Sequence, residues 1–145
     1  MNIRTGTLAD LSRLATVNSM GSENGIKIAR ERLPAFIEAS NLIVAEEGLE
    51  IVGLLYWKRE FLGDKNWFLV QVTVAENYRR RGVGEKLWRY LLSEAKTHGA
   101  KYVFADIAID NDASMQLAQK LGGISAGSID LGEDDTRNFY RFDLL

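Results

Sequence analysis

Three consecutive arginines, Arg79, Arg80 and Arg81, are followed directly by Gly82-Val83-Gly84, and this segment has the clearest chemical potential in the chain. A guanidinium group donates several charge-assisted hydrogen bonds to phosphate oxygens. Glycine lacks a Cβ, so a ligand can come close to its backbone. The segment therefore predicts a turn that binds phosphate groups.

The elements on either side of this turn have to position it. The preceding residues 68–74 read FLVQVTV, which is typical of a strand. Residues 84–97 predict an amphipathic helix with Leu87, Leu91 and Ala95 on one face. A helix N-terminus presents backbone N–H groups and a partial positive charge, so it binds anions readily. The succession of strand, arginine turn and helix favours a phosphate site over an ordinary solvated turn.

Other phosphate motifs fit less well. A P-loop requires Lys followed by Ser or Thr after its last glycine, but Glu85-Lys86-Leu87 stands here. The dinucleotide motif GxGxxG is incomplete because Leu87 takes the place of its third glycine, although Asp106 lies about where a ribose-binding acid is expected. A nucleotide-phosphate site unrelated to coenzyme A therefore stays open as a weaker alternative.

The segment resembles the acyl-CoA signature of the GCN5-related N-acetyltransferase family, which is Arg/Gln-x-x-Gly-x-Gly/Ala between a strand and a helix. Arg79, Gly82 and Gly84 match that signature. A second block also matches, because Asn111 follows the apolar run YVFADIAI and opens the segment NDASMQLAQKLGG. The resemblance is specific over roughly residues 42–123.

The resemblance implies acetyl-CoA as the co-substrate. Its diphosphate would lie on the turn, and its pantetheine would pair with the strand backbone as an added strand. It further implies that this strand splays from its neighbour near residues 107–109. The residues expected to bind the co-substrate are Val72, Thr73, Val74, Arg79, Arg80, Arg81, Gly82, Val83, Gly84, Glu85, Asn111 and Ser114.

The implied chemistry is direct attack of a neutral amine on the thioester. The backbone N–H of Val72 is expected to stabilise the thioester oxygen. Asp106, a carboxylate within an apolar strand, is the candidate base, although it could equally be a solvent-facing acid. Many family members have a tyrosine as general acid where this chain has Ala118, so Tyr140 is the candidate replacement, beside Tyr102 or water.

Composition restricts the classes of protein. The 145 residues include no cysteine and only one histidine, His98, so we expect neither disulfides nor a metal site. A net charge of −2 argues against nucleic acid as a partner. The sequence shows neither a membrane span nor a signal peptide, which predicts a cytoplasmic protein. We expect a monomer or a homodimer.

The pattern of elements predicts an α/β fold. We expect a single acyl-CoA N-acyltransferase domain over residues 1–145, with a mixed, mostly antiparallel sheet of about six or seven strands and helices on both faces. Thr7 is a predicted N-cap, and Pro34 should break or restart a helix over 26–40. Residues 20–25 are predicted to be a loop. Strands are expected at 2–5, 42–47, 51–58, 67–74, 102–109, 125–131 and 139–144.

Two function classes follow from these observations. The first is an N-acetyltransferase that moves an acetyl group from acetyl-CoA to a primary amine of a small molecule or peptide. The second is an acyl-CoA-binding sensor or partner domain without turnover, which Ala118 would permit. The run Glu133-Asp134-Asp135 is interpreted as a solvated loop that could also attract a cationic amine.

Overall fold

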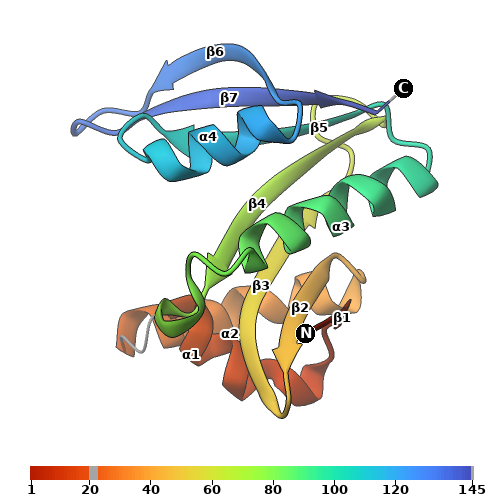
Figure 1. Cartoon of the computed structure of the whole chain (residues 1–145), viewed down its shortest axis with the longest axis vertical. Helices are drawn as coiled ribbons and strands as arrows, with labels where there is room; N and C mark the ends of the chain where they lie inside the picture. The colour runs from red at the N-terminus through yellow and green to blue at the C-terminus, as the bar shows by residue number, and fades with distance from the viewer. Residues whose placement is uncertain (20–22, 145) are drawn as a thin grey trace. The chain divides into compact units, whose positions relative to one another are not determined.

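The chain forms a mixed α/β fold, as the sequence predicts (Figure 1). The computed structural model describes residues 1–19 and 23–144. Seven strands are hydrogen-bonded in the order β1-β2-β3-β4-β5-β7-β6. They are β1 (Asn2–Thr5), β2 (Leu42–Glu47), β3 (Glu50–Lys58), β4 (Asn66–Val74), β5 (Tyr102–Ala108), β6 (Ile124–Asp130) and β7 (Thr136–Asp143). The helices are α1 (Leu11–Ser19), α2 (Glu23–Glu38), α3 (Val83–Thr97) and α4 (Asp112–Lys120), with short 3-10 helices η1 (Leu8–Asp10) and η2 (Glu76–Tyr78).

The Cα positions group the chain into two compact units. Unit 1 consists of Met1–Trp57 and Gln71–Tyr90, and unit 2 consists of Lys58–Val70 and Leu91–Leu145. The boundaries fall inside β3, β4 and α3, so these three elements each continue from one unit into the other. The expectation of one domain over residues 1–145 stays a prediction.

Strands β1, β2 and β3 of unit 1 form an antiparallel meander. Asn2 is opposite Glu46, and Glu47 is opposite Glu50 across the tight turn at Gly48-Leu49. Gly48 has a φ of 60°, a conformation that glycine adopts without steric cost. The strands expected at 42–47 and 51–58 are confirmed, and they form a hairpin.

Helices cover both faces of β3 within unit 1. The Phe36 ring of α2 lies 4.7 Å from the ring of Tyr56. A Cβ on Gly53 would lie 3.1 Å from Leu87 of α3, on the opposite face because side chains alternate along a strand. Trp57, Trp67 and Trp88 are all buried.

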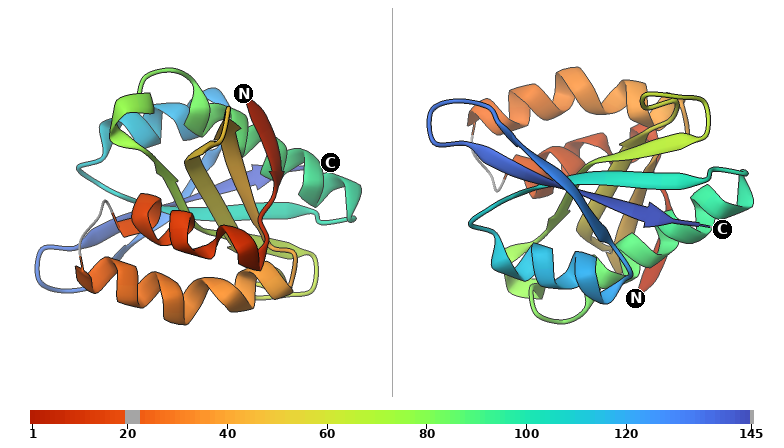
Figure 2. Two further views of the ribbon diagram at one scale, coloured as in Figure 1. Left: turned by 90° about the horizontal axis from the view of Figure 1, so that it is seen from below. Right: turned by 90° about the horizontal axis from the view of Figure 1, so that it is seen from above.

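Two expectations about the second helix were wrong. Pro34 lies inside α2, which continues without a break from Glu23 to Glu38. Leu33 and Ile37 are buried, so packing of the apolar face stabilises the helix across the proline. Residues 23–25, expected to be loop, belong to the first turn of α2, whereas residues 20–22 lie outside the described residues. Helices α1 and α2 pack side by side (Figure 2).

Unit 2 contains the parallel pair of strands. The register of β4 with β5 runs from Asn66–Tyr102 to Leu69–Ala105. Strand β7 is antiparallel to both β5 and β6, and the β6–β7 register shifts at a bulge between Ser125 and Ser128. In the part of the chain that the structure describes, no helix is long and apolar enough to span a membrane.

Candidate functional site

The predicted phosphate-binding turn lies in unit 1, between η2 and the first residue of α3. Arg80 and Gly82 both have left-handed backbones, with φ values of 64° and 78°. A Cβ built on Gly82 would meet no atom within 4 Å, so the glycine faces open space. Val83 and Leu87 are buried and fix the first turn of α3 against the sheet. The backbone of the turn is therefore open on one side and anchored on the other.

The three arginines are all exposed, and their side chains have different neighbours. The Nε atom of Arg79 donates to the Val74 carbonyl at 3.2 Å. The Arg81 guanidinium lies over the Tyr78 ring, 5.1 Å from its centroid. Arg79 thus ties the turn to the end of β4, and Arg81 is held beside Tyr78.

Tyr78 packs beside the turn, next to Arg81. Its hydroxyl donates to a Glu50 carboxylate oxygen at 3.1 Å. That hydrogen bond raises the pKa of Tyr78 above its ordinary value. Tyr78 is therefore a positioning residue between the β2–β3 turn and Arg81.

This geometry can accommodate an anionic ligand. The first-turn N–H groups of an α-helix have no partner within that helix, so those of α3 can donate to a bound anion. The exposed arginines can add charge-assisted hydrogen bonds. The predicted residues 79–85 are consecutive in the chain, and their role in binding the co-substrate stays a prediction.

The predicted pantetheine-binding strand is the end of β4, where Val72, Thr73 and Val74 are all half-buried. The Val74 carbonyl already accepts the hydrogen bond from Arg79, so a ligand would share that oxygen. Strand β4 continues to Val74 beyond its register with β5, which runs as far as Leu69.

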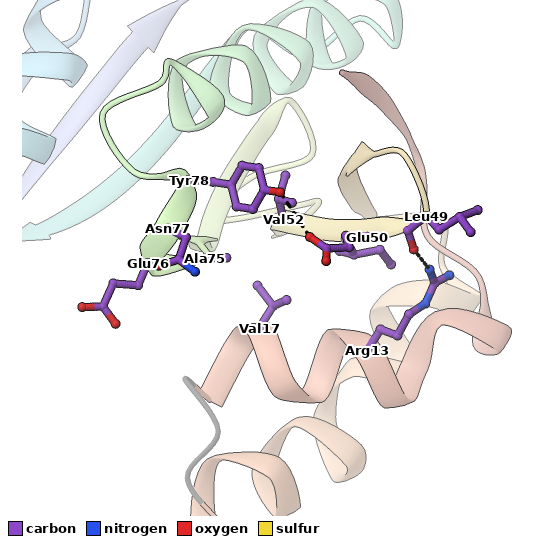
Figure 3. A pocket seen from close by; sticks show the side chains of 10 residues that line it. Arg13, Val17, Leu49, Glu50, Val52, Ala75, Glu76, Asn77 and Tyr78 are labelled. Carbon is purple, nitrogen blue, oxygen red and sulfur yellow. Dashed lines mark hydrogen bonds between the residues drawn. The ribbon is translucent and has the colours of Figure 1, made fainter.

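A cavity of about 460 Å³ lies next to the turn in unit 1 (Figure 3). In the close-up, Val17 points from α1 toward the cavity, and Arg13 reaches the Leu49 carbonyl, to which it donates at 2.8 Å. Tyr78 and Glu50 form the side nearest the turn. Sequence reasoning missed this cavity because its walls come from α1, β3 and η2, which are far apart in the chain.

Sequence reasoning also missed a polar chain on the sheet of unit 1. The Tyr56 hydroxyl donates to Gln71 Oε1 at 2.6 Å, and Gln71 Nε2 donates to Thr73 Oγ1 at 3.0 Å. The signal that could have found it is the pair of polar residues, Gln71 and Thr73, in the otherwise apolar run FLVQVTV.

In unit 2, the candidate base Asp106 is held by an ion pair. Arg137 Nη1 donates to Asp106 Oδ2 at 2.8 Å, and Arg137 also binds the Asp135 carboxylate at 2.6 Å. The hydrogen bond from Arg137 lowers the pKa of Asp135. The acidic loop therefore contributes Asp135 to an ion-pair network, while Glu133 and Asp134 are exposed.

Tyr140 and Asp106 lie on opposite faces of the β5–β7 pair. Tyr140 is opposite Ala105 in the register, whereas Asp106 is opposite Phe139. Residues directly opposite one another share a face, and neighbouring residues alternate. Tyr140 is also buried, so the two candidate acid–base residues are not brought together within this unit.

Asn111 is the N-cap of α4, as predicted. Its Oδ1 accepts a hydrogen bond from the Ser114 N–H at 3.2 Å, which leaves its amide nitrogen as the donor for a ligand. Ala118 is fully buried in α4. Gly123 has no room for a side chain, since a Cβ would lie 2.8 Å from the Ala118 carbonyl.

Among residues 1–19 and 23–144, no group of three His, Cys, Asp or Glu side chains could hold a metal ion. His98 follows the end of α3, where Nδ1 lies 2.9 Å from the Glu94 carbonyl.

Comparison with known proteins bears on the fold and the family. The fold is similar to an N-acetyltransferase from Staphylococcus aureus Mu50, with a TM-score of 0.86, 20% identity and coverage of 99% of this chain and 98% of that one. A ribosomal-protein-alanine N-acetyltransferase from Brucella melitensis has a TM-score of 0.83 at 25% identity, covering 99% and 100%. A Salmonella typhimurium acetyltransferase solved with its cofactor acetyl-CoA has a TM-score of 0.77 at 20% identity, covering 99% and 94%.

The relatives found by sequence are longer proteins that match this chain over only part of their length. A phosphinothricin N-acetyltransferase of Streptomyces viridochromogenes is 32% identical over 91 residues, which is 60% of this chain and 49% of that protein. A mycothiol acetyltransferase of Corynebacterium glutamicum is 28% identical over 96 residues, covering 66% and 32%. The chain therefore spans half or less of these relatives. Residues 15–123 match the acetyltransferase (GNAT) family, and the chain belongs to that family.

Proposed function

We propose that the protein is an acetyl-CoA-dependent N-acetyltransferase that acetylates a primary amine of a small molecule or peptide. One observation carries this proposal: the turn before α3 combines left-handed backbone at Arg80 and Gly82 with exposed arginines at a helix N-terminus. Membership of the GNAT family supports the proposal that acetyl-CoA is the acyl donor.

The co-substrate would be held by its diphosphate and its pantetheine. The diphosphate accepts hydrogen bonds from the first turn of α3, and Arg80 and Arg81 add positive charge. The pantetheine would run along Val72–Val74 as an added strand. In unit 2, Asn111 and Ser114 stay predicted co-substrate residues. The open space beside Gly82 supports this assignment, because a phosphate can approach the backbone there.

The reaction would proceed by direct attack of the amine on the thioester carbonyl. The Val72 N–H would donate to the oxygen as negative charge develops on it. The ammonium form of the acceptor must lose a proton, for which Asp106 is the proposed base, and the departing thiolate would gain one from water, because Tyr140 is buried on the other face of the β5–β7 pair. Because a general acid contributes about 10²–10⁴-fold, Ala118 predicts a slower reaction rather than none.

The second candidate function is an acyl-CoA-binding sensor or partner domain. It is favoured by Ala118, which is buried in α4 at the position where many family members have the tyrosine that acts as general acid. The ion pair of Asp106 with Arg137 is a further observation on this side, since the carboxylate is already engaged.

A screen for thiol release from acetyl-CoA with a panel of amines and peptides tests the enzyme. Turnover with any acceptor supports the transferase, whereas CoA binding without turnover supports the sensor. Gly82→Trp should abolish CoA binding by filling the turn. If this variant binds CoA as well as the wild type, the site is wrong.

A further inference from the structure

The polar chain Tyr56–Gln71–Thr73 spans two strands of unit 1. Tyr56 on β3 is 1% exposed, and Gln71 and Thr73 on β4 are half-buried. Polar groups in such positions cost free energy unless they are hydrogen-bonded. The two bonds of 2.6 Å and 3.0 Å satisfy that need between the three side chains.

The hydrogen bonds of the chain run in one direction. The Arg32 guanidinium on α2 is near enough to the Tyr56 hydroxyl to act against the rise that burial causes in its pKa, and a guanidinium can only donate hydrogen bonds. The Tyr56 hydroxyl donates to Gln71, and the Gln71 amide donates to Thr73. The Thr73 hydroxyl proton is therefore the next donor of the chain, and it can be donated to an oxygen acceptor.

The end of the chain lies at the proposed reaction centre. Gln71 and Thr73 flank Val72, whose N–H is the proposed donor to the thioester oxygen. Side chains two residues apart share a face of a strand, so Gln71 and Thr73 point to the side of Tyr56 and Phe36 of α2. A molecule approaching Val72 from the α2 side would meet the Thr73 hydroxyl and the second N–H of Gln71.

The charge of Arg32 bears on whether the oxygen that accepts from Thr73 is anionic or neutral. Arg32 is exposed on α2, and its charge partly offsets the rise that burial causes in the pKa of Tyr56. A positive charge at one end of a chain of donors favours an anionic acceptor over a neutral one. We propose that Arg32, Tyr56, Gln71 and Thr73 form a subsite for a carboxylate, so that the acetylated amine is that of an amino acid-like substrate. This inference rests on the proposed function.

Matched pairs of acceptors test the subsite. Each α-amino acid is compared with its α-amide at equal concentration of the neutral amine, because the two amines differ in pKa. The expected result is a kcat/KM for the acid that is roughly ten- to a hundredfold higher, as for a hydrogen bond to a charged group. Equal kcat/KM for acids and amides across the panel would overturn the proposal while leaving the transferase intact.

Variants separate recognition from folding. Thr73→Val keeps the side-chain shape and removes the end donor, and Arg32→Gln removes the charge. Both should raise KM for the acid about tenfold or more, with a smaller change for the amide. Arg30→Gln, an exposed residue of the same helix, is the matched control and should keep the preference. Loss of the preference in the Arg30 variant alone would contradict the assignment.

A binding measurement decides the matter if no acceptor supports turnover. NMR spectra of the wild type with CoA are recorded during titration with glycine and with glycinamide. The Gln71 side-chain amide signals should shift with glycine and much less with glycinamide, and Arg32→Gln should remove the difference. Absence of any shift at Gln71 with either probe would overturn the carboxylate subsite, independently of whether the protein is an enzyme.

Discussion

Asp10 is a buried carboxylate that accepts hydrogen bonds from two arginines and from a backbone N–H. Arg4 donates to both of its oxygens at 2.8 and 2.9 Å, and Arg13 donates at 2.8 Å. The Thr7 N–H donates at 2.8 Å, which completes the predicted N-cap of η1. The hydrogen bonds from Arg4 are the largest cause of a pKa for Asp10 far below its ordinary value. This carboxylate therefore joins β1, η1 and α1.

We expect Asp10→Asn to destabilise the protein by about 2–4 kcal/mol, because it leaves partly buried guanidinium groups without their counter-charge. Urea denaturation measures the free energy of unfolding. Asp143→Asn is the matched control, since Asp143 pairs with Arg141 at 2.6 Å but is 42% exposed. Its expected cost is below about 1 kcal/mol. Equal costs for the two variants would contradict the role of burial at Asp10.

Asp10 should also give the stability a dependence on acid. Its pKa is lowered in the folded state, so its contribution is complete above the unfolded pKa of about 4 and is lost as pH falls below that value. The difference in unfolding free energy between wild type and Asp10→Asn should therefore shrink from pH 5 to pH 2. Urea titrations at several pH values measure it. A difference that stays constant through this range would show that the charge is not the stabilising feature.

At the scale of elements, the glycines on either side of α3 allow the effect of backbone strain to be distinguished from the effect of ligand binding. Gly82 precedes α3 and Gly99 follows it, with φ values of 78° and 81°. A Cβ on either would meet no atom within 4 Å. The two positions therefore impose the same backbone strain on alanine, but only Gly82 lies in the proposed phosphate site.

Gly82→Ala and Gly99→Ala should each lower the unfolding free energy by about 1–2 kcal/mol, the cost of a left-handed backbone at a residue with a Cβ. Calorimetric titration should then show CoA affinity reduced roughly tenfold or more in the Gly82 variant, because one charge-assisted hydrogen bond is weakened. The Gly99 variant should bind CoA as the wild type does. Equal affinities of the two variants would place the phosphate elsewhere.

Pro34 allows a test of how much the proline costs the stability of α2. A proline inside a helix removes one hydrogen bond, here with the carbonyl of Arg30, and costs about 3 kcal/mol in a helix interior. Pro34→Ala should therefore raise the thermal midpoint and the unfolding free energy by about 1–3 kcal/mol. Ala35→Pro in the same helix should lower both. A destabilised Pro34→Ala variant would mean that the ring packs more favourably than this helix geometry implies.

Elements with local signals could be predicted from the sequence. The apolar face of α3, the β2–β3 hairpin and the Asn111 cap each depend on neighbouring residues, and all three are found. The continuity of α2 could not be predicted, since it depends on the burial of Leu33 and Ile37 by distant segments.

The same distinction holds for the site. The arginine turn is contiguous in sequence and was predictable, whereas the chain from Tyr56 to Thr73 requires two strands to be brought together. The placement of Tyr140 and Asp106 on opposite faces depends on the β5–β7 register, which no residue pattern specifies.

For the whole molecule, the two compact units share three continuous elements. The unit boundaries at Trp57, Val70 and Tyr90 fall inside β3, β4 and α3. Unfolding of β3, β4 or α3 in one unit would therefore disturb the part of the same element that belongs to the other unit. We expect differential scanning calorimetry to show one transition, with calorimetric and van't Hoff enthalpies in agreement. Two resolved transitions would contradict a single domain over residues 1–145.

The central claim is that the backbone of the turn before α3 binds the diphosphate of coenzyme A. The most direct measurement is the NMR titration of 15N-labelled protein with CoA and, separately, with pantetheine, which lacks the diphosphate. We predict that amide signals of residues 80–85 shift strongly with CoA and little with pantetheine. CoA binding that leaves these amides unchanged, or no binding at millimolar CoA, would contradict the account.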